Sequence, residues 1–415
     1  MPNSKKQSLA LLGFFLALTQ FPIWADGGKE EKSLDLSKWD TPVADSLKKN
    51  VEFWIQVNSQ YSNEQGLIHD SDDVSHIYSV LNLKKSKKRG SDSIRREKAK
   101  WRKVLLSVHR KQATPEKFSA DEKRIFEMFK DTEEPNKFLN AAHRKRLRFQ
   151  RGQRDSFLSG LGQSGKYLHR MEATFAQAGL PVELTRLPFV ESSFNLKARS
   201  KVGASGIFQF MKSTARLFLR VDDQVDERND PLRASEAAAQ LLKLNFQSLG
   251  NWPLAVTAYN HGRKALMRAV RRVGSDRLED LIGGYTGRSF GFASRNFYPE
   301  LVALVELEKN PSKYFNSSEI ERAPELLFYE VKLSRDTQLA QLMKAFGVTI
   351  QEMREFNPGL SEDIFLKKIP LPVGYRLRMK RTVAESEETL TRQFFEKFDS
   401  LVKSPQGDGA PSIKM

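Results

Sequence analysis

The sequence predicts a mainly α-helical protein that closes with a small module of two strands and two helices. Between residues 151 and 310 apolar residues recur at helical spacing, and no stretch alternates as a strand would. The alanine-rich run 234–249 is the plainest helix of this part. Strand-like alternation occurs at 328–333, and the stretch 375–379 is a second strand that can return beside it.

The length of 415 residues is enough for two or three domains. We divide the chain into a signal peptide (1–25), a helical N-terminal region (26–150), a helical central domain (151–310), a strand–helix–helix–strand module (327–380) and a disordered tail (404–415). In the central domain, Asp230-Pro231 is a good helix start, and Gly250 stops the helix that follows.

The first residues have the features of an export signal. Lys5 and Lys6 give a positive start, the stretch 8–24 is largely apolar, and Ala25 is a small residue that suits cleavage. The apolar stretch is short for a membrane span. We therefore expect export to the periplasm, in the cell envelope. The chain has no cysteine, which excludes disulfides, thiolate metal sites and a lipid-bearing cysteine.

The region 26–150 is expected to be helical. Apolar and aromatic residues lie at helical spacing from Val51 to Tyr61, and Gly66 to Asp70 ends that helix. The pair His69-Asp70 occurs in metal phosphohydrolases, but one pair without further ligands does not make a metal site. We predict neither a metal nor a cofactor for this protein.

Glu191 is the candidate general acid. It follows Leu184 and Leu187 at helical spacing, so it would continue an apolar stripe and lie partly desolvated. Desolvation disfavours the charged carboxylate and raises its pKa, which lets a glutamate donate a proton near neutral pH. No second acid stands in the motif segments. The acids between Asp222 and Asp230 belong to a solvated loop before a helix.

Two further segments supply groups that suit a sugar. In the glycine-rich segment 203–211, Gly206 lets backbone approach a ligand, Gln209 can donate and accept hydrogen bonds, and Phe208 and Met211 pack beneath. The alternative is a plain turn before a helix that begins near Ile207, with Gln209 on its surface. Tyr259 and Asn260 end a helix that begins around residue 252, where Tyr259 offers an apolar body with a polar tip.

Together, the segments 191–194, 203–211 and 258–262 resemble the lysozyme-like catalytic domain of lytic murein transglycosylases, above all the membrane-bound type D family. The resemblance implies a lysozyme-like catalytic domain at 151–310 that cleaves the MurNAc-β-1,4-GlcNAc bond. It also implies that Glu191 first protonates the leaving oxygen and then deprotonates the C6 hydroxyl, which gives 1,6-anhydro-MurNAc ends in cell-wall remodelling. The implied substrate-binding residues are Ser192, Ser193, Gly206, Phe208, Gln209, Tyr259, Asn260 and Tyr298.

The segment 291–299 is similar to a fourth motif of that family, whose tyrosine contacts the catalytic glutamate. Aligned through Arg295 and Pro299, this tyrosine falls on Phe297, while Tyr298 is shifted by one residue. We favour Tyr298, turned inward by the local helix.

The module 327–380 resembles LysM, a small βααβ peptidoglycan-binding fold. The usual Gly-Asp-Thr-Leu after the first strand is replaced here by Arg335-Asp336-Thr337-Gln338-Leu339. The resemblance therefore predicts the fold more firmly than it predicts glycan binding.

The net charge of +17 favours anionic partners. For an exported protein these are peptidoglycan glycan strands with their peptide stems, and the envelope surface. No nucleic-acid-binding module is present, so we expect no nucleic acid as partner. The alternatives to a transglycosylase are a hydrolase of the goose-type lysozyme kind and a non-catalytic cell-wall-binding scaffold.

Overall fold

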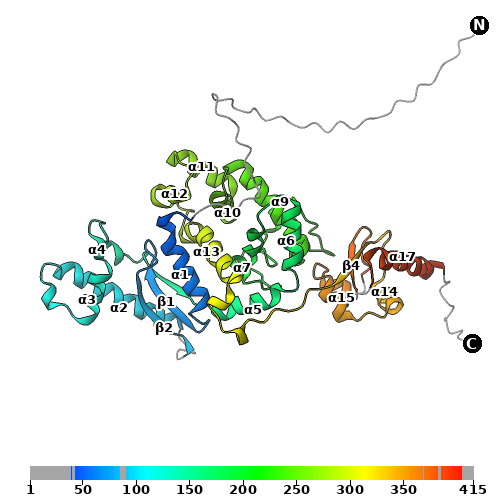
Figure 1. The fold of residues 1–415 in the computed structure, drawn as a ribbon, viewed down its shortest axis with the longest axis horizontal. Helices are drawn as coiled ribbons and strands as arrows, with labels where there is room; N and C mark the ends of the chain where they lie inside the picture. The colour runs from blue at the N-terminus through cyan, green and yellow to red at the C-terminus, as the bar shows by residue number, and fades with distance from the viewer. Residues whose placement is uncertain (1–38, 40–42, 85–89, 368, 382–384, 404–415) are drawn as a thin grey trace, which may run out of the picture. The chain divides into compact units, whose positions relative to one another are not determined.

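The computed structural model describes residues 39, 43–84, 90–367, 369–381 and 385–403. The expected signal peptide and the expected tail from residue 404 lie outside these residues. Among the described residues helices predominate, as the sequence predicts, and two small antiparallel sheets accompany them (Figure 1). None of the described helices combines the length and the apolar character that a membrane crossing requires.

The N-terminal region combines helices with a three-stranded sheet. Its elements are α1 (Asp45–Ser59), β1 (Gln65–Asp70), β2 (Ile77–Asn82), α2 (Gly90–Lys111), η2 (Pro115–Lys117), α3 (Ala120–Met128), α4 (Lys137–Ala141) and β3 (Leu147–Arg151). The strand order is β2-β1-β3, and both pairings are antiparallel. The sequence analysis expected helices here and did not predict this sheet, whose central strand is formed by residues expected to end a helix.

The central part of the chain is helical and shares one hydrophobic core. Its elements are α5 (Arg154–Ser164), α6 (Leu168–Gln177), η3 (Val182–Arg186), α7 (Leu187–Ser192), α8 (Lys212–Ala215), η4 (Glu227–Asn229), α9 (Pro231–Leu249), α10 (Trp252–His261), α11 (Arg263–Val273), α12 (Leu278–Gly284), α13 (Phe292–Lys309), η5 (Pro311–Lys313) and η6 (Ser317–Glu319). In Figure 1, α13 lies among α1, α7 and α10, and it packs against all three.

The predicted ends of α9 are confirmed. The Asp230 side chain accepts hydrogen bonds from the backbone N–H groups of Leu232 and Arg233, at 3.0 and 3.1 Å, and Pro231 occupies the first turn. Gly250 ends the helix with a φ of 81°. Local sequence alone fixes these ends, since each depends on a cap or a left-handed residue rather than on distant contacts.

A buried ion pair fastens α13 to η3, the turn that leads into α7. The guanidinium of Arg186 donates to Glu308 with its Nε atom, at 2.7 Å, and it also contacts Glu172. Arg322 donates to the other oxygen of Glu308, at 2.6 Å. Because both Arg186 and Glu308 are buried, this network holds the end of α13 in one place relative to α7.

The C-terminal segment has the two predicted strands and, between them, the two predicted helices followed by a third, short one. Its elements are β4 (Phe328–Lys332), α14 (Leu339–Phe346), α15 (Ile350–Phe356), α16 (Glu362–Leu366), β5 (Arg376–Lys380) and α17 (Glu387–Lys403). The two strands pair antiparallel. The short α16 and the long α17 were not expected from the sequence.

Candidate active site

Glu191 stands at the end of a short helix, as expected, but the helix is interrupted before it. Residues 182–186 form a 3₁₀ turn, and α7 begins only at Leu187, with Pro188 in its first turn. Leu184 and Leu187 are fully buried, while Glu191 is half-buried. The helix then ends abruptly, because Ser193 takes a left-handed conformation with a φ of 49°.

The carboxyl group of Glu191 is neutral at neutral pH in the free protein. Burial raises its pKa to about 8. The side chain as a whole retains some exposed surface, so a ligand can reach it. A carboxylic acid that keeps its proton at neutral pH and remains accessible has the two properties that a general acid requires.

Tyr259 lies beside Glu191. Its hydroxyl donates a hydrogen bond of 2.9 Å to the backbone carbonyl of Phe208. Burial, and then the negative charge of Glu191, raise the pKa of this hydroxyl well above its usual value. Tyr259 therefore stays a neutral donor and joins the glycine-rich segment to the helix that carries it.

The glycine-rich segment is held by its own backbone. Gly206 has a φ of 77°, and a Cβ atom there would lie 1.7 Å from the carbonyl oxygen of Arg228. The close neighbour of this glycine is thus another loop of the protein and not a ligand. Gln209 donates its side-chain amide to the carbonyls of Ala198 and Gly206, at 3.2 and 2.8 Å. In this structure both residues shape the turn.

One alternative for this segment is excluded, and one detail differs from the prediction. The alternative of a helix from Ile207 does not hold, because Gln209 has a φ of 48° and the next helix begins only at Lys212. Phe208 is fully buried, as expected, so it contributes its carbonyl group rather than its ring to the site. Met211, expected to pack beneath the segment, is 42% exposed.

Ser192, Ser193 and Asn260 lie around Glu191 with different partners. The Ser192 hydroxyl donates to the carbonyl of Ile207, at 2.9 Å, and so ties α7 to the glycine-rich segment. Ser193 is half-buried and lines a hollow of about 560 Å³ together with Asn195 and other residues of α5 and the loop after α7. Asn260 is exposed and accepts a hydrogen bond from Ser294 of α13.

A second hollow, of about 440 Å³, lies on the side of Tyr259. Tyr259 lines it together with Gly262, Arg263 and Arg268 from the start of α11, among others. The first hollow is lined by Ser192 and Ser193, which follow Glu191, and the second is lined by Tyr259. They offer an extended ligand room to lie beside the motif residues.

In the segment 291–299, the structure contradicts the prediction that Tyr298 turns toward the site. Phe297 stacks nearly parallel to Tyr259, with ring centroids 6.4 Å apart. Tyr298 is buried and packs against Trp39, with centroids 6.0 Å apart. Adjacent residues of a helix point about 100° apart, so only one of the two can face α10. That residue is Phe297, which disfavours Tyr298 as a substrate contact.

Glu300 is a residue of the site that the sequence analysis missed. It is half-buried on α13, and burial, followed by the negative charge of Glu191, raises its pKa well above the usual value. The motif comparison ended at Pro299, one residue too early. The signal available in the sequence was an acid placed three residues after Phe297, one helical turn along the same face.

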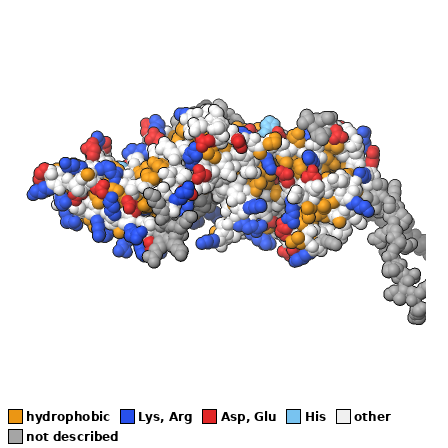
Figure 2. Space-filling model, turned by 90° about the horizontal axis from the view of Figure 1, so that it is seen from below, with side chains coloured by type: hydrophobic (Ala, Val, Ile, Leu, Met, Phe, Trp, Pro, Cys, Tyr) orange, Lys and Arg blue, Asp and Glu red, His pale blue; other side chains and the backbone are white. Residues whose placement is uncertain are grey.

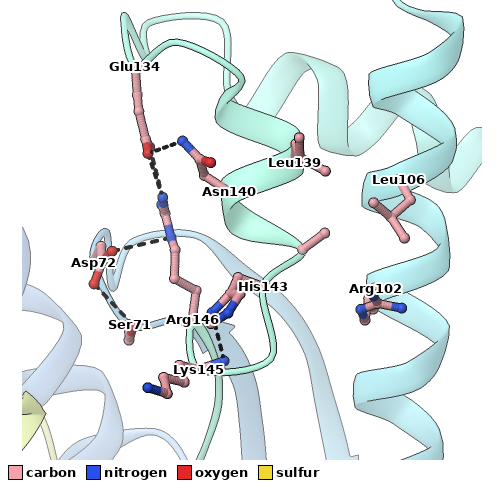
Figure 3. A pocket seen from close by; sticks show the side chains of 11 residues that line it. Ser71, Asp72, Arg102, Leu106, Glu134, Leu139, Asn140, His143, Lys145 and Arg146 are labelled. Carbon is pink, nitrogen blue, oxygen red and sulfur yellow. Dashed lines mark hydrogen bonds and ion pairs between the residues drawn. The ribbon is translucent and has the colours of Figure 1, made fainter.

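The His69-Asp70 pair is structural. Asp70 is fully buried and accepts hydrogen bonds from Tyr78 and from Arg146, whose guanidinium also contacts Asp72 and Glu134. Figure 3 shows Arg146 between Asp72 and Glu134 on the wall of a pocket of about 600 Å³. The negative charge of the buried Asp70 is therefore compensated by Arg146 of the protein itself.

His69 is buried between the rings of Phe53 and Phe292, and burial lowers its pKa to about 4. Across the described ranges no group of three or more His, Cys, Asp or Glu side chains is arranged to hold a metal ion. The pair is accordingly part of the packing around β1.

Comparison with known proteins identifies the central helices. The sequence model of the family described as "Transglycosylase SLT domain" matches residues 171–282, which include Glu191 and Tyr259. Membrane-bound lytic murein transglycosylase D of Escherichia coli is 27% identical over 199 residues, which cover 47% of this chain and 42% of that protein. Peptidoglycan transglycosylase gp16 of Escherichia phage T7 is 33% identical over 131 residues, which cover 31% of this chain and 9% of that protein.

Among solved structures, the 70 kDa soluble lytic transglycosylase of Escherichia coli matches 37% of this chain and 26% of its own, with 18% identity and a TM-score of 0.30. The chain spans less than half the length of the type D relative. The family match covers the helices that carry the candidate acid and its tyrosine. Residues 171–282 of this chain are therefore similar to the transglycosylase SLT domain.

Proposed function

We propose that this protein is a lytic transglycosylase that cleaves the MurNAc-β-1,4-GlcNAc bond of peptidoglycan and leaves 1,6-anhydro-MurNAc ends, in cell-wall remodelling. The observation that carries the proposal is the neutral, accessible carboxyl group of Glu191 within an SLT domain. The names of the relatives from Escherichia coli and phage T7 support peptidoglycan as the substrate.

The reaction needs one proton and no water. The Glu191 carboxyl gives its proton to the glycosidic oxygen while the bond between that oxygen and C1 of MurNAc breaks. The resulting carboxylate then takes the proton of the C6 hydroxyl of the same sugar, and O6 forms a bond to C1. Glu191 ends in its acid form, ready for another cycle. A pKa of about 8 suits both steps, since the group is acidic enough to donate and basic enough to accept.

The neighbours of Glu191 serve this chemistry by position. Tyr259 is a neutral donor next to the carboxyl group, and Ser192 fixes the end of α7 against the glycine-rich segment. Two hollows, one lined by Ser192 and Ser193 and the other by Tyr259, are the proposed places for the glycan chain. Ser193, which lines the first hollow, and the exposed Asn260 are the proposed sugar contacts.

The remaining assignments complete the proposal. Residues 1–25 would direct export to the periplasm, and residues 151–310 would form the catalytic domain, which is wider than the matched range. Residues 327–380 would be a LysM-like module. Its antiparallel strands and the helices between them support that fold, while its altered opening motif leaves glycan binding to be measured.

The deciding experiment is mass spectrometry of purified murein digested by the full chain and by Glu191→Gln. We expect anhydro-ended fragments from the wild type, and a loss of at least about 100-fold in rate for the variant, because the amide cannot donate the proton. The variant should fold and bind murein as the wild type does. Products with free reducing ends would identify a hydrolase instead, and intact murein after wild-type treatment would favour a binding scaffold.

A further inference from the structure

The loop 222–230, which lies between α8 and the start of α9, is paired with the C-terminal segment. The backbone N–H of Asp226 donates to the carbonyl of Gly359, at 2.7 Å. In return, the N–H of Ser361 donates to the carbonyl of Gln224, at 2.9 Å. The loop and the connection between α15 and α16 therefore pair as two antiparallel strands do.

Side chains interlock across the same contact. Val225 of the loop is fully buried within the hydrophobic cluster of the C-terminal segment. Phe328 and Phe356 of that segment are buried within the core of the central helices. A buried ion pair joins Arg378 of β5 to Asp230, which caps α9, at 2.6 Å. Because the two parts cannot separate without exposing these side chains to water, the C-terminal segment holds the loop in place.

The loop in turn holds both ends of the glycine-rich segment. The buried guanidinium of Arg228 donates to the carbonyls of Gly203 and Phe210, at 2.9 and 3.2 Å. The same guanidinium is oriented by the carboxylate of Asp226, at 2.7 and 2.9 Å. Asp226 thus links the two contacts, since its N–H binds the C-terminal segment and its carboxylate fixes the group that closes the turn.

The glycine-rich segment is bonded to both neighbours of Glu191. The carbonyl of Ile207 accepts a hydrogen bond from Ser192, at 2.9 Å, and the carbonyl of Phe208 accepts one from Tyr259, at 2.9 Å. A continuous series of contacts therefore leads from the C-terminal segment to the proposed acid. A shift of the loop 222–230 would release the ends of the turn and move both acceptors.

We propose that the C-terminal segment is a positioning part of the active site, which acts through Asp226 and Arg228 to hold the glycine-rich segment beside Glu191. The inference rests on the proposed transglycosylase function. It gives the segment a role that does not depend on glycan binding, because the contacts that carry it lie within the protein. Cleavage of short fragments should therefore depend on this contact, even where a fragment does not reach the C-terminal segment.

Ser361 allows one hydrogen bond of the contact to be removed in the full chain. Ser361→Pro deletes the N–H that donates to Gln224, and the φ of Ser361, −69°, is one that proline adopts. Ser361→Ala is the matched control, since it keeps the N–H and loses only a hydroxyl that has no hydrogen-bond partner among the described residues. Val225→Ala is a second, independent variant, which shortens the side chain that enters the C-terminal cluster.

Kinetics with short soluble murein fragments give the first readout. We expect Ser361→Pro and Val225→Ala to lower kcat about tenfold with KM within about twofold, because displaced positioning groups act on the rate. Their activity should also fall at a lower pH than that of the wild type, because a looser turn admits water, which favours the charged form of Glu191. Wild-type kcat in both variants, a loss of kcat without this shift in pH, or an equal loss in Ser361→Ala would overturn the proposal.

Amide hydrogen exchange tests the coupling without any activity. The N–H groups of Gly206 and Gln209 bond to the carbonyls of Ala198 and Gly206 within the turn. They should exchange about tenfold faster in Ser361→Pro than in Ser361→Ala, while exchange in β1 of the N-terminal region stays the same. Unchanged exchange in the turn, or faster exchange in β1 as well, would refute the inference. If the turn responds as expected but the wild type leaves murein intact, only the proposed function fails.

Discussion

At the scale of single residues, burial of the Glu191 carboxyl group makes the stability of the folded protein depend on pH. The pKa of this group is about 8 in the folded state and near the ordinary 4.5 in the unfolded chain. Between these values the folded protein binds one more proton than the unfolded chain, so the free energy of unfolding falls as pH rises. The group favours folding fully only below its unfolded pKa, and this contribution is lost as pH rises through the folded pKa.

Glu191→Gln should therefore gain thermal stability over the wild type as pH rises. The two proteins should differ little at about pH 4.5, and the advantage of the variant should grow up to about pH 8. Scanning calorimetry across this range measures it. Glu306→Gln should behave oppositely, because hydrogen bonds from Lys313 and Tyr314 lower the pKa of Glu306, and its deficit should vanish in acid. A Tm difference for Glu191→Gln that is constant with pH would contradict the assigned pKa.

The sequence singles out Glu191 and Tyr259 as neighbours but not the groups around them. Glu191 and Tyr259 lie together, as the motifs indicate, because each ends a helix whose limits are locally encoded. The sequence could not place Glu300 near Glu191, since its position depends on how α13 is rotated about its axis against α7 and α10. The same rotation decides between Phe297 and Tyr298, which a one-residue shift in a motif alignment cannot do.

At the scale of elements, the conformation of the glycine-rich turn depends both on its own residues and on contacts with a distant loop. Its positive φ angles at Gly203 and Gly206 are the local demand that the sequence reveals. The distant demand is the Arg228 backbone pressed against Gly206, together with the Arg228 guanidinium, which donates to the carbonyl of Gly203 at 2.9 Å. The N-terminal sheet was missed for a similar reason, because β1 pairs with β3, which lies beyond three helices in sequence.

Gly206→Ala should unfold the turn, whereas Gly203→Ala should be tolerated. Both positions have positive φ, which costs a non-glycine residue about 1–2 kcal/mol. Only Gly206 would also place its Cβ atom 1.7 Å from a carbonyl oxygen, while nothing lies within 4 Å of a Cβ atom at Gly203. Urea denaturation should show the larger loss for Gly206→Ala. Equal losses in the free energy of unfolding for the two variants would mean that the loop around Arg228 moves away at little cost.

At the scale of the whole molecule, the chain carries a large excess of positive charge. The net charge is +17, and on the face shown in Figure 2 the Lys and Arg side chains lie in several separate groups among the acids. Some basic residues instead serve buried contacts, such as Arg378, which donates to Asp230 at 2.6 Å. The sequence predicts the excess charge directly, but it does not separate the cations that are buried and paired from those that remain for a partner.

Binding of Glu191→Gln to purified sacculi should weaken as salt rises. Exposed charges interact over about 8 Å at physiological ionic strength and about 3 Å at 1 M salt, so a charge-driven interaction fades over this range. Cleavage of short soluble fragments by the wild type should change much less, because it depends on the buried site. Sacculus pull-down in a salt series provides the measurement. Binding that does not change up to 1 M salt would point to sugar contacts rather than charge.

The position of α13 has a practical consequence for anyone who isolates the SLT domain. The family match ends at residue 282, ten residues before α13 begins at Phe292. A fragment trimmed to the matched range would lose the ring that stacks on Tyr259 and the acid beside Glu191. It would also bare the apolar surface that α13 covers on α7 and α10. Such a fragment would carry the first three motifs and still expose an apolar surface that favours aggregation.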